Sequence, residues 1–236
     1  MNRRYRVVLF DLFGTVVHFV PPPGARGTFG WLRDPLARHG LAIPFDEFRT
    51  ALVAVSMAMV AERNEEHREI SSQERFRRVL ARFSAAVDPA VAEDLSRAHM
   101  AHLADRTEMP AHHGDLLRDA GAHYRLGLVS NFDHAPTAHA ILARHGVDAC
   151  FAVTLISESF GRRKPHPAIF RAALDHFDAN PAEALYVGDT PADDIVGARA
   201  TGMDVAWINR DGAALPDPAP TYTLRGLAEL RQVLVL

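Results

Sequence analysis

Short apolar runs separated by turn residues recur along this 236-residue chain and predict the strands of a buried sheet. The runs are apolar throughout and lack the alternation of a strand with one face in water, so we expect helices on both faces of the sheet. The predicted strands are 6–10 (RVVLF), 125–130 (RLGLVS), 151–157 (FAVTLIS), 184–189 (ALYVGD) and 204–209 (DVAWIN).

Helical patterns lie between these runs. Residues 135–146 end in a glycine suited to a helix C-terminus, and residues 193–202 close in the same way with Gly202. Residues 167–177 begin with a proline, which fits the first turn of a helix. Strand and helix in regular succession predict an α/β fold, a Rossmann-like, doubly wound parallel sheet with right-handed crossovers.

One segment, residues 17–106, is too long for a single crossover and is almost wholly helical in pattern. We interpret it as an inserted helical cap domain on a core formed by residues 1–16 and 107–236. Its predicted helices are 44–64, 71–87, which opens with the capping-box spacing of Ser71 and Glu74, and 88–104, with Asp88 as N-cap and Pro89 following.

Composition narrows the classes of function. The formal net charge of −3 gives no electrostatic footprint for nucleic acid. No run approaches the roughly 18 apolar residues that span a membrane, and Asp11 interrupts the first apolar run, which argues against a secretory signal. The single cysteine, Cys150, favours a reducing compartment, so we expect a cytoplasmic protein. The oligomeric state is left open, a homodimer included.

Polar side chains follow four of the predicted strands or their loops. Singly, each has a structural explanation such as capping a helix, but ligands bind at the carboxyl ends of the strands in open α/β sheets. These residues are Asp11, Ser130 with Asn131, Lys164, and the cluster Asp189, Asp193 and Asp194. Lys164 is the only lysine in an arginine-rich chain, which makes it a candidate for a role that a guanidinium cannot fill.

The order and spacing of these residues resemble the haloacid dehalogenase superfamily. Four stretches carry the resemblance: FDLFGT (10–15), LVSNF (128–132), RRKPHPAIF (162–170) and YVGDTPADDIVGARATGM (186–203). The insert lies where that family has its helical cap. The resemblance implies a hydrolase that acts on a small molecule through a covalent intermediate.

It also implies roles for individual residues. Asp11 is the expected nucleophile, and Lys164 is expected to neutralise it and the developing charge. Thr15 and Ser130 are expected to hydrogen-bond the transferring group, together with backbone N–H groups around Gly14 and Asn131.

A magnesium site is implied as well. Its expected ligands are Asp11, the backbone carbonyl of Phe13, Asp189 and either Asp194 or Asp193, with Asp194 the better fit to the spacing. The cation would reduce the repulsion between Asp11 and an incoming phosphate.

Phe13 departs from the pattern, because phosphatases of the superfamily usually carry there a second aspartate that acts as acid and base. An aromatic residue at this position is typical of the 2-haloacid dehalogenase branch, which works without a metal and lacks the acidic GDxxxxD stretch. We favour a Mg²⁺-dependent phosphatase on a small-molecule monoester, because the clustered carboxylates need a cation more than Phe13 needs a halide. Without an acid, such an enzyme is expected to prefer leaving groups that depart unprotonated, such as aryl or acyl phosphates.

Two alternatives remain open. The first is a 2-haloacid dehalogenase, with Asp11 attacking carbon and Arg26 or Arg33 holding the substrate carboxylate. The second is a ligand-binding relative with weak turnover. His18, near the cap entry, is a candidate substrate contact and a weaker candidate for the missing acid. His112, His113 and His166 lack the paired spacing of a zinc site.

Overall fold

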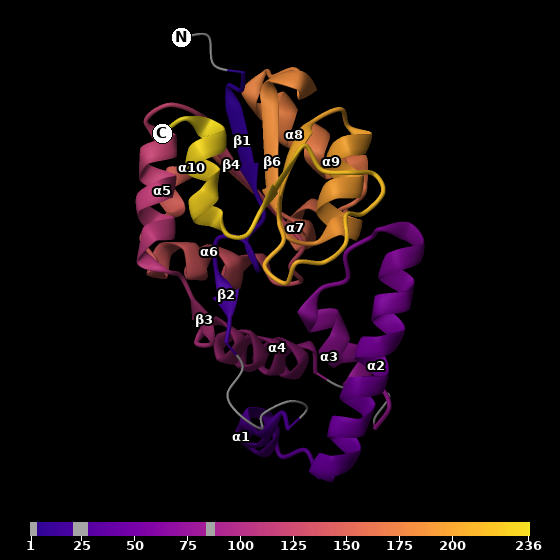
Figure 1. Cartoon of the computed structure of the whole chain (residues 1–236). Helices are drawn as coiled ribbons and strands as arrows, with labels where there is room; N and C mark the ends of the chain where they lie inside the picture. Colours follow the sequence, from indigo (N-terminus) through magenta and orange to yellow (C-terminus); the bar gives the residue numbers. More distant parts are fainter. Residues whose placement is uncertain (1–3, 21–27, 84–87) are drawn as a thin grey trace. The chain divides into compact units, whose positions relative to one another are not determined.

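The computed structural model describes residues 4–20, 28–83 and 88–236. They form two compact units, one of Met1–Phe19 with Glu108–Leu236 and the other of Val20–Thr107. The first unit contains a six-stranded sheet flanked by helices, which confirms the α/β fold class (Figure 1). Among the described residues, no helix combines the length and the apolar character needed to cross a membrane.

The six strands are all parallel and follow the order β5-β4-β1-β6-β7-β8. The five predicted strands are all present, one with the predicted bounds and four slightly shorter, and β8 is an addition that the apolar pattern did not reveal. The bounds are β1(Val7–Phe10), β4(Arg125–Ser130), β5(Val153–Ile156), β6(Ala184–Gly188), β7(Asp204–Ile208) and β8(Tyr222–Leu224). A separate pair joins β2(His18–Phe19) to β3(Thr107–Glu108).

Helices cover both faces of the large sheet. On one face, Val7 and Leu9 of β1 belong to a buried cluster with side chains of α8 and α9, including Phe170 and Ala198. The helices α5 and α10 lie on the other side of the sheet (Figure 1). The helices of this unit are α5(Ala111–Gly121), α6(Ala135–Arg144), α7(Ser157–Phe160), α8(Pro167–Phe177), α9(Val196–Ala200) and α10(Leu230–Leu234).

The predicted helix ends are reproduced where a residue fixes them. Pro167 occupies the first turn of α8, as its lack of an N–H donor allows, and α8 has the predicted bounds. Gly146 follows α6 with a φ of +64°, the conformation that ends helices. The segment predicted as one helix over 193–202 is instead a π-helical turn, Pro191–Ile195, followed by the short α9.

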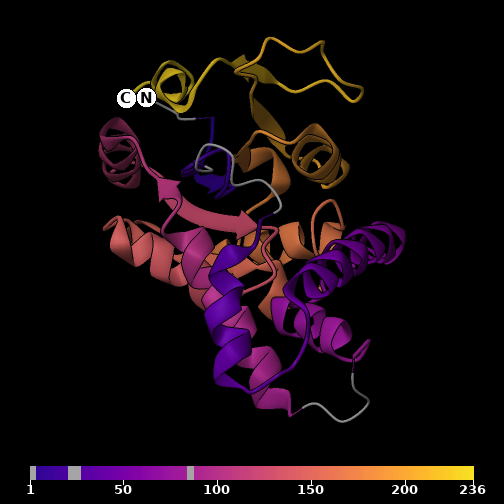
Figure 2. The same cartoon turned by 90° about the horizontal axis from the view of Figure 1, so that it is seen from below.

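The second unit is helical. It consists of η1(Gly30–Leu32), α1(Arg33–Arg38), α2(Phe45–Glu66), α3(Ser72–Leu80) and α4(Pro89–Ala104). Helix α2 lies beside α3 in both views (Figures 1 and 2). Buried apolar side chains from these helices form one core, among them Phe48, Met59, Phe76 and Leu95.

Helix starts in this unit follow their predicted caps. Ser71 Oγ accepts from the Glu74 N–H at 3.1 Å, and Asp88 Oδ1 accepts from the Ala90 N–H at 2.9 Å. The prediction of a helix over 71–87 was too long, because α3 ends at Leu80 and the Phe83 N–H closes a tighter turn onto the Leu80 carbonyl. Residues 84–87 lie outside the described part of the chain.

Candidate active site

The polar residues meet at the point where the strand order reverses. From β1 the chain adds β4 and then β5 on one side of the sheet, and then β6, β7 and β8 on the other side of β1. The direction therefore reverses between β1 and β6, which are the neighbours at this switch point. Asp11 directly follows β1 and Asp189 directly follows β6. Helices cannot close over the sheet edge at such a point, which leaves a crevice suited to a ligand.

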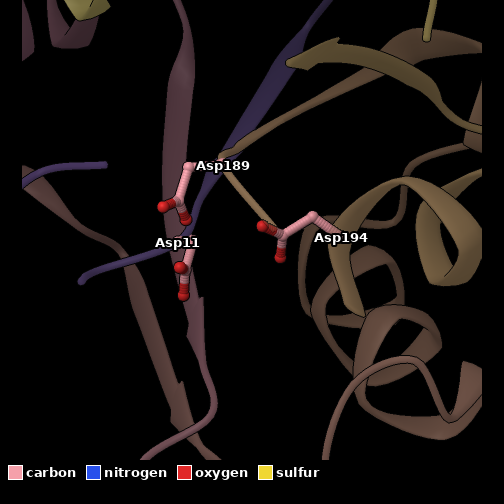
Figure 3. A group of neighbouring side chains, drawn as sticks. All are labelled: Asp11, Asp189 and Asp194. Carbon is pink, nitrogen blue, oxygen red and sulfur yellow. The ribbon is translucent and has the colours of Figure 1, made fainter. Parts of the chain in front are cut away.

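Three carboxylates gather there. Asp11, Asp189 and Asp194 each offer an oxygen that lies within 4.8 Å of the others, and their side chains converge in Figure 3. Asp194 is fully buried and Asp11 is only 7% exposed. Within the described residues, this is the only group of three or more His, Cys, Asp or Glu side chains whose ligand atoms lie close enough to share a metal ion.

These carboxylates fit a hard divalent cation. Carboxylate oxygens are the ligands that Mg²⁺ prefers, and three clustered carboxylates, two of them buried, with one ammonium among them leave negative charge to be offset. Glycine at position 14 is part of the same fit. Its φ of +76° disfavours other residues, and a Cβ there would collide with the Asp189 carboxylate.

Lys164 supplies the single ammonium. Its Nζ lies 2.7 Å from Asp11 Oδ1, 2.7 Å from Asp194 Oδ1 and 2.8 Å from the Tyr186 hydroxyl, so all three protons are donated. Tyr186 in turn donates to the Val129 carbonyl at 3.0 Å. Burial lowers the pKa of Lys164, but the charges of Asp11 and Asp194 outweigh burial and raise it above its ordinary value. The ammonium is therefore charged at every physiological pH.

The electrostatics of Asp11 follow from its position. Burial raises the pKa of Asp11 to about 7, an increase that Lys164 opposes and the charge of Asp194 reinforces. Burial and the charge of Asp194 also raise the pKa of Asp189. An additional cation would stabilise the ionised forms of both, which is the state that a nucleophile and a metal ligand require.

The π-helical turn decides which acid of the pair 193–194 faces the cluster. Asp194 turns inward, where its second oxygen accepts from the Thr190 N–H at 2.9 Å. Gly188 gives it room, because a Cβ at that position would overlap the Asp194 carboxylate. Asp193 instead accepts from the Asn131 amide at 3.0 Å.

Asn131 uses its side chain to hold the backbone of Lys164. Its Oδ1 accepts from the Lys164 N–H at 2.7 Å, and its Nδ2 donates to the Lys164 carbonyl at 3.0 Å. Sequence reasoning assigned Asn131 to the substrate through its backbone and gave no indication of this contact. The residue links the ends of β4 and the loop that carries the lysine.

Two buried hydroxyls, one in the turn after β1 and one at the end of β4, have no partner. Thr15 Oγ1 and Ser130 Oγ are both inaccessible and make no hydrogen bond within the described residues. Unpaired buried hydroxyls are costly, so such groups commonly await a ligand. The backbone N–H of Gly14 was expected from the sequence to contact the transferring group. In the structure this N–H already has a partner, because it donates to the Val17 carbonyl at 2.8 Å within the turn after β1.

The side chain of Phe13 packs against a second aromatic ring. Its ring centroid lies 4.7 Å from that of Phe132, which follows Asn131. Phe13 is half-buried, so the pair forms an apolar surface contributed by the loops after β1 and β4.

A histidine cluster borders the turn after β1. His113 is buried and donates from Nδ1 to the Val16 carbonyl at 2.9 Å, a role that sequence reasoning missed. The His18 ring lies 5.4 Å from that of His113. Burial, with Arg210 and His112, lowers the pKa of His18, and burial lowers that of His113 to about 4.

The dehalogenase alternative considered two arginines for binding a substrate carboxylate. Of these, Arg33 belongs to the helical unit. The Arg33 guanidinium lies over the Phe45 ring at 3.9 Å. Arg26 is outside the described residues.

Comparison with known proteins decides the family. Residues 5–202 match the model of the haloacid dehalogenase-like hydrolases. The chain belongs to this family. This hydrolase is 31% identical over 206 residues to the glyceraldehyde 3-phosphate phosphatase of Pyrococcus abyssi, which covers 86% of this chain and 81% of the relative. It is also 31% identical over 214 residues to the phosphoglycolate phosphatase of Rhodospirillum rubrum, covering 86% and 79%.

A solved structure named as a 2-haloacid dehalogenase is similar as well. The 2-haloacid dehalogenase of Pseudomonas syringae pv. Tomato matches with a TM-score of 0.75 and 26% identity over 98% of both chains. The hydrolase thus has relatives named for phosphoester cleavage and relatives named for carbon–halogen cleavage, and its own side chains must distinguish the two.

Proposed function

We propose that this hydrolase is a Mg²⁺-dependent phosphatase acting on a small-molecule phosphate monoester through an aspartyl-phosphate intermediate on Asp11. The observation that supports it most is the group of three carboxylates, of which Asp11 and Asp194 are buried and paired with the Lys164 ammonium and Asp189 is half-buried. Carbon–halogen cleavage by a carboxylate needs no such excess of negative charge. In a phosphatase, a divalent cation would bind the carboxylates, and the cation together with the lysine would offset the charge of a dianionic phosphate.

In this proposal the chain's own residues bind and orient the phosphoryl group. Thr15 and Ser130 donate their unpaired hydroxyl protons to its oxygens. Lys164 keeps Asp11 ionised and stabilises charge that develops on the phosphoryl oxygens. Asp11 attacks phosphorus while the bond from phosphorus to the leaving oxygen breaks and the leaving group departs, and water then cleaves the aspartyl phosphate and restores the carboxylate.

The metal belongs to the same proposal. Asp11, Asp189, Asp194 and the backbone carbonyl of Phe13 would hold it, and when bound it would neutralise charge between the nucleophile and the phosphate. The phosphatase names of two relatives that align over most of this chain support the assignment. The free thiol of Cys150 supports a cytoplasmic location as part of the proposal.

Dehalogenation of a 2-haloacid is the second candidate. Phe13 favours it, as does the similarity to the dehalogenase structure. In that reaction Asp11 attacks carbon and the leaving halide needs no proton.

The two candidates are separated by assaying phosphate release and halide release with and without Mg²⁺, using Asp11→Asn as the blank. Phosphate release that requires Mg²⁺ and is lost in D11N supports the proposal. Halide release that persists in EDTA would replace it with the second candidate. If neither product forms above the blank while phosphate and Mg²⁺ still raise the melting temperature, the chain is a ligand-binding relative.

A further inference from the structure

We propose that this hydrolase acts on activated phosphates, meaning acyl or aryl phosphates whose leaving group departs as a stable anion. The inference rests on the proposed phosphatase function and narrows its substrate class. It comes from the aromatic pair of Phe13 and Phe132 and from the lack of a suitable proton donor beside Asp11 within the described residues.

Cleavage of an alkyl phosphate places negative charge on an alkoxide, a very poor leaving group unless a side chain protonates it. The donor must reach within about 3 Å of the leaving oxygen and must have a pKa near the working pH. The loop after β1 and the loop after β4 flank the nucleophile. Their largest side chains, Phe13 and Phe132, are phenyl rings whose centroids lie 4.7 Å apart, and neither can carry that proton.

The other proton-bearing groups around Asp11 are poorly suited to the task. Asp189 and Asp194 lie in the same group as Asp11 and, as the proposed ligands of the cation, act as carboxylates without a proton to give. Lys164 gives its three protons to Asp11, Asp194 and Tyr186, so none remains for a leaving group. The Tyr186 hydroxyl is buried and donates to a backbone carbonyl. Thr15 and Ser130 carry hydroxyls, which donate hydrogen bonds but do not release protons near neutral pH.

Among the histidines, His113 has its Nδ1 proton on the Val16 carbonyl. His18 and His112 both pack edge-on against the His113 ring. His18 belongs to the segment that follows the turn after β1, so it is the histidine that competes most directly for the role. It is therefore included as a variant in the test below.

The first step balances without an acid for an activated substrate. A carboxylate oxygen of Asp11 forms a bond to phosphorus while the bond from phosphorus to the leaving oxygen breaks. The electron pair stays on the leaving oxygen as a carboxylate or phenolate, which departs unprotonated. The product on the enzyme is itself an acyl phosphate, so an acyl phosphate substrate exchanges one such bond for another of similar energy.

The second step balances in the same way. Water forms a bond to phosphorus, the bond from phosphorus to Asp11 breaks, and the pair returns to the Asp11 carboxylate. The proton lost by water passes to the phosphate product or to solvent. Without a positioned base this step is slow, so the phosphoryl-enzyme is expected to accumulate during turnover.

The test compares a series of phosphates with leaving groups of increasing pKa in the presence of Mg²⁺. Acetyl phosphate represents acyl phosphates, p-nitrophenyl and phenyl phosphate represent aryl phosphates, and glycerol phosphate represents alkyl phosphates. We expect kcat/KM to fall steeply along the series and p-nitrophenol to be released in a burst that matches the enzyme concentration. Acetyl phosphate and p-nitrophenyl phosphate report separately which of the two activated classes is preferred.

Variants at position 13 provide the second measurement. Phe13→Asp restores a carboxyl and is expected to raise kcat/KM for glycerol phosphate by about 10²-fold or more, with little gain for acetyl phosphate. Phe13→Leu removes the ring without adding an acid and is the matched control. His18→Asn is expected to leave the slope of the series unchanged.

Two results would overturn the inference, and a third would reject the proposed function on which it rests. Equal rates for alkyl and aryl phosphates in the wild type would overturn the inference even if F13D fails to fold. A steepening of the series in H18N would show that His18 is the acid. Absence of phosphate release from every substrate, with D11N equal to wild type, would instead reject the proposed function itself.

Discussion

The side chain of Asn131 holds both the N–H and the carbonyl of Lys164, at 2.7 and 3.0 Å. A lysine side chain has many rotamers, and fixing its backbone at two points restricts where the ammonium can lie. The positions of Asp11 and Asp194 relative to that ammonium therefore depend on a residue that touches neither carboxylate.

Replacing Asn131 with alanine removes this clamp. We expect kcat to fall about 10- to 100-fold because Lys164 is no longer held in position. KM should change little, because the contacts to the substrate are kept. Steady-state kinetics on p-nitrophenyl phosphate checks the split, with Asn64→Ala on the exposed part of α2 as control. Unchanged kcat in N131A would show that the loop holds Lys164 without the amide.

Replacing Lys164 with methionine leaves Asp11 and Asp194 buried without their cation. Removing one partner of a buried ion pair commonly costs about 3–5 kcal/mol, so a large drop in the free energy of unfolding is expected without metal. Added Mg²⁺ should raise the stability of K164M more than that of wild type, since the metal would then be the only cation there. Urea unfolding with and without Mg²⁺ measures both effects.

Arg171→Met is the matched control for that experiment, because it removes an exposed cation from α8. It should change stability by less than about 0.5 kcal/mol and leave the response to Mg²⁺ as in wild type. A K164M protein as stable as wild type without metal would contradict the electrostatic account of the site.

Replacing Gly14 with alanine tests the cradle that holds Asp189. The alanine Cβ would collide with the Asp189 carboxylate, so that side chain must move out of the cluster. We expect Mg²⁺ affinity, measured by calorimetry, to fall about tenfold or more together with activity.

Gly146→Ala separates collision from backbone strain. Gly146 also has a positive φ, +64°, but nothing lies within 4 Å of a Cβ there. Both variants lose about 1–2 kcal/mol to backbone strain at their positive φ, yet only G14A should lose metal affinity. Equal affinities in the two variants would remove Asp189 from the proposed ligand set.

The buried His113 predicts a loss of stability in acid. Its pKa is about 4 in the folded protein because burial disfavours the charged ring, against about 6.5 in an unfolded chain. Below pH 6.5 the unfolded state takes up a proton that the folded state refuses, so stability falls as the pH drops from 6.5 towards 4. The expected loss from this group at pH 5 is about 2 kcal/mol.

His113→Asn keeps a donor for the Val16 carbonyl but cannot titrate. The variant should therefore lose less stability than wild type between pH 7 and pH 5, as measured by urea unfolding. His176→Asn removes an exposed histidine and should follow the wild-type curve. Parallel curves for wild type and H113N would mean that the ring is protonated without cost in the folded state.

Much of the fold could be predicted because local chemistry and tertiary structure agree. The continuous apolar runs were strands, and Pro167 fixed the start of α8. The strand β8 escaped notice because its three residues, Tyr222–Leu224, include one exposed position and carry little apolar signal. The segment Pro191–Ile195 was predicted to be partly α-helical but is π-helical. In this turn Asp194 points inward and accepts from the Thr190 N–H, a contact that the sequence pattern does not reveal.

The site also contains residues that the sequence could predict and residues that it could not. Residues at strand ends could be brought together from topology alone, since parallel strands share an edge. Tyr186 could not be assigned, because a tyrosine within an apolar strand is indistinguishable from core until its hydroxyl is found 2.8 Å from Lys164. Neither the Asn131 clamp nor the bond from His113 to Val16 has a sequence signal, because 33 and 97 residues separate the partners.

The central claim is that Asp11 carries the phosphoryl group during turnover. The direct measurement is rapid acid quenching of the hydrolase with acetyl phosphate and Mg²⁺, followed by peptide mass spectrometry. The account predicts a phosphoryl group on the peptide that contains Asp11, present only with Mg²⁺ and absent from D11N. A phosphoryl group on another residue, or phosphate release with no modified Asp11 peptide at any quench time, would contradict it.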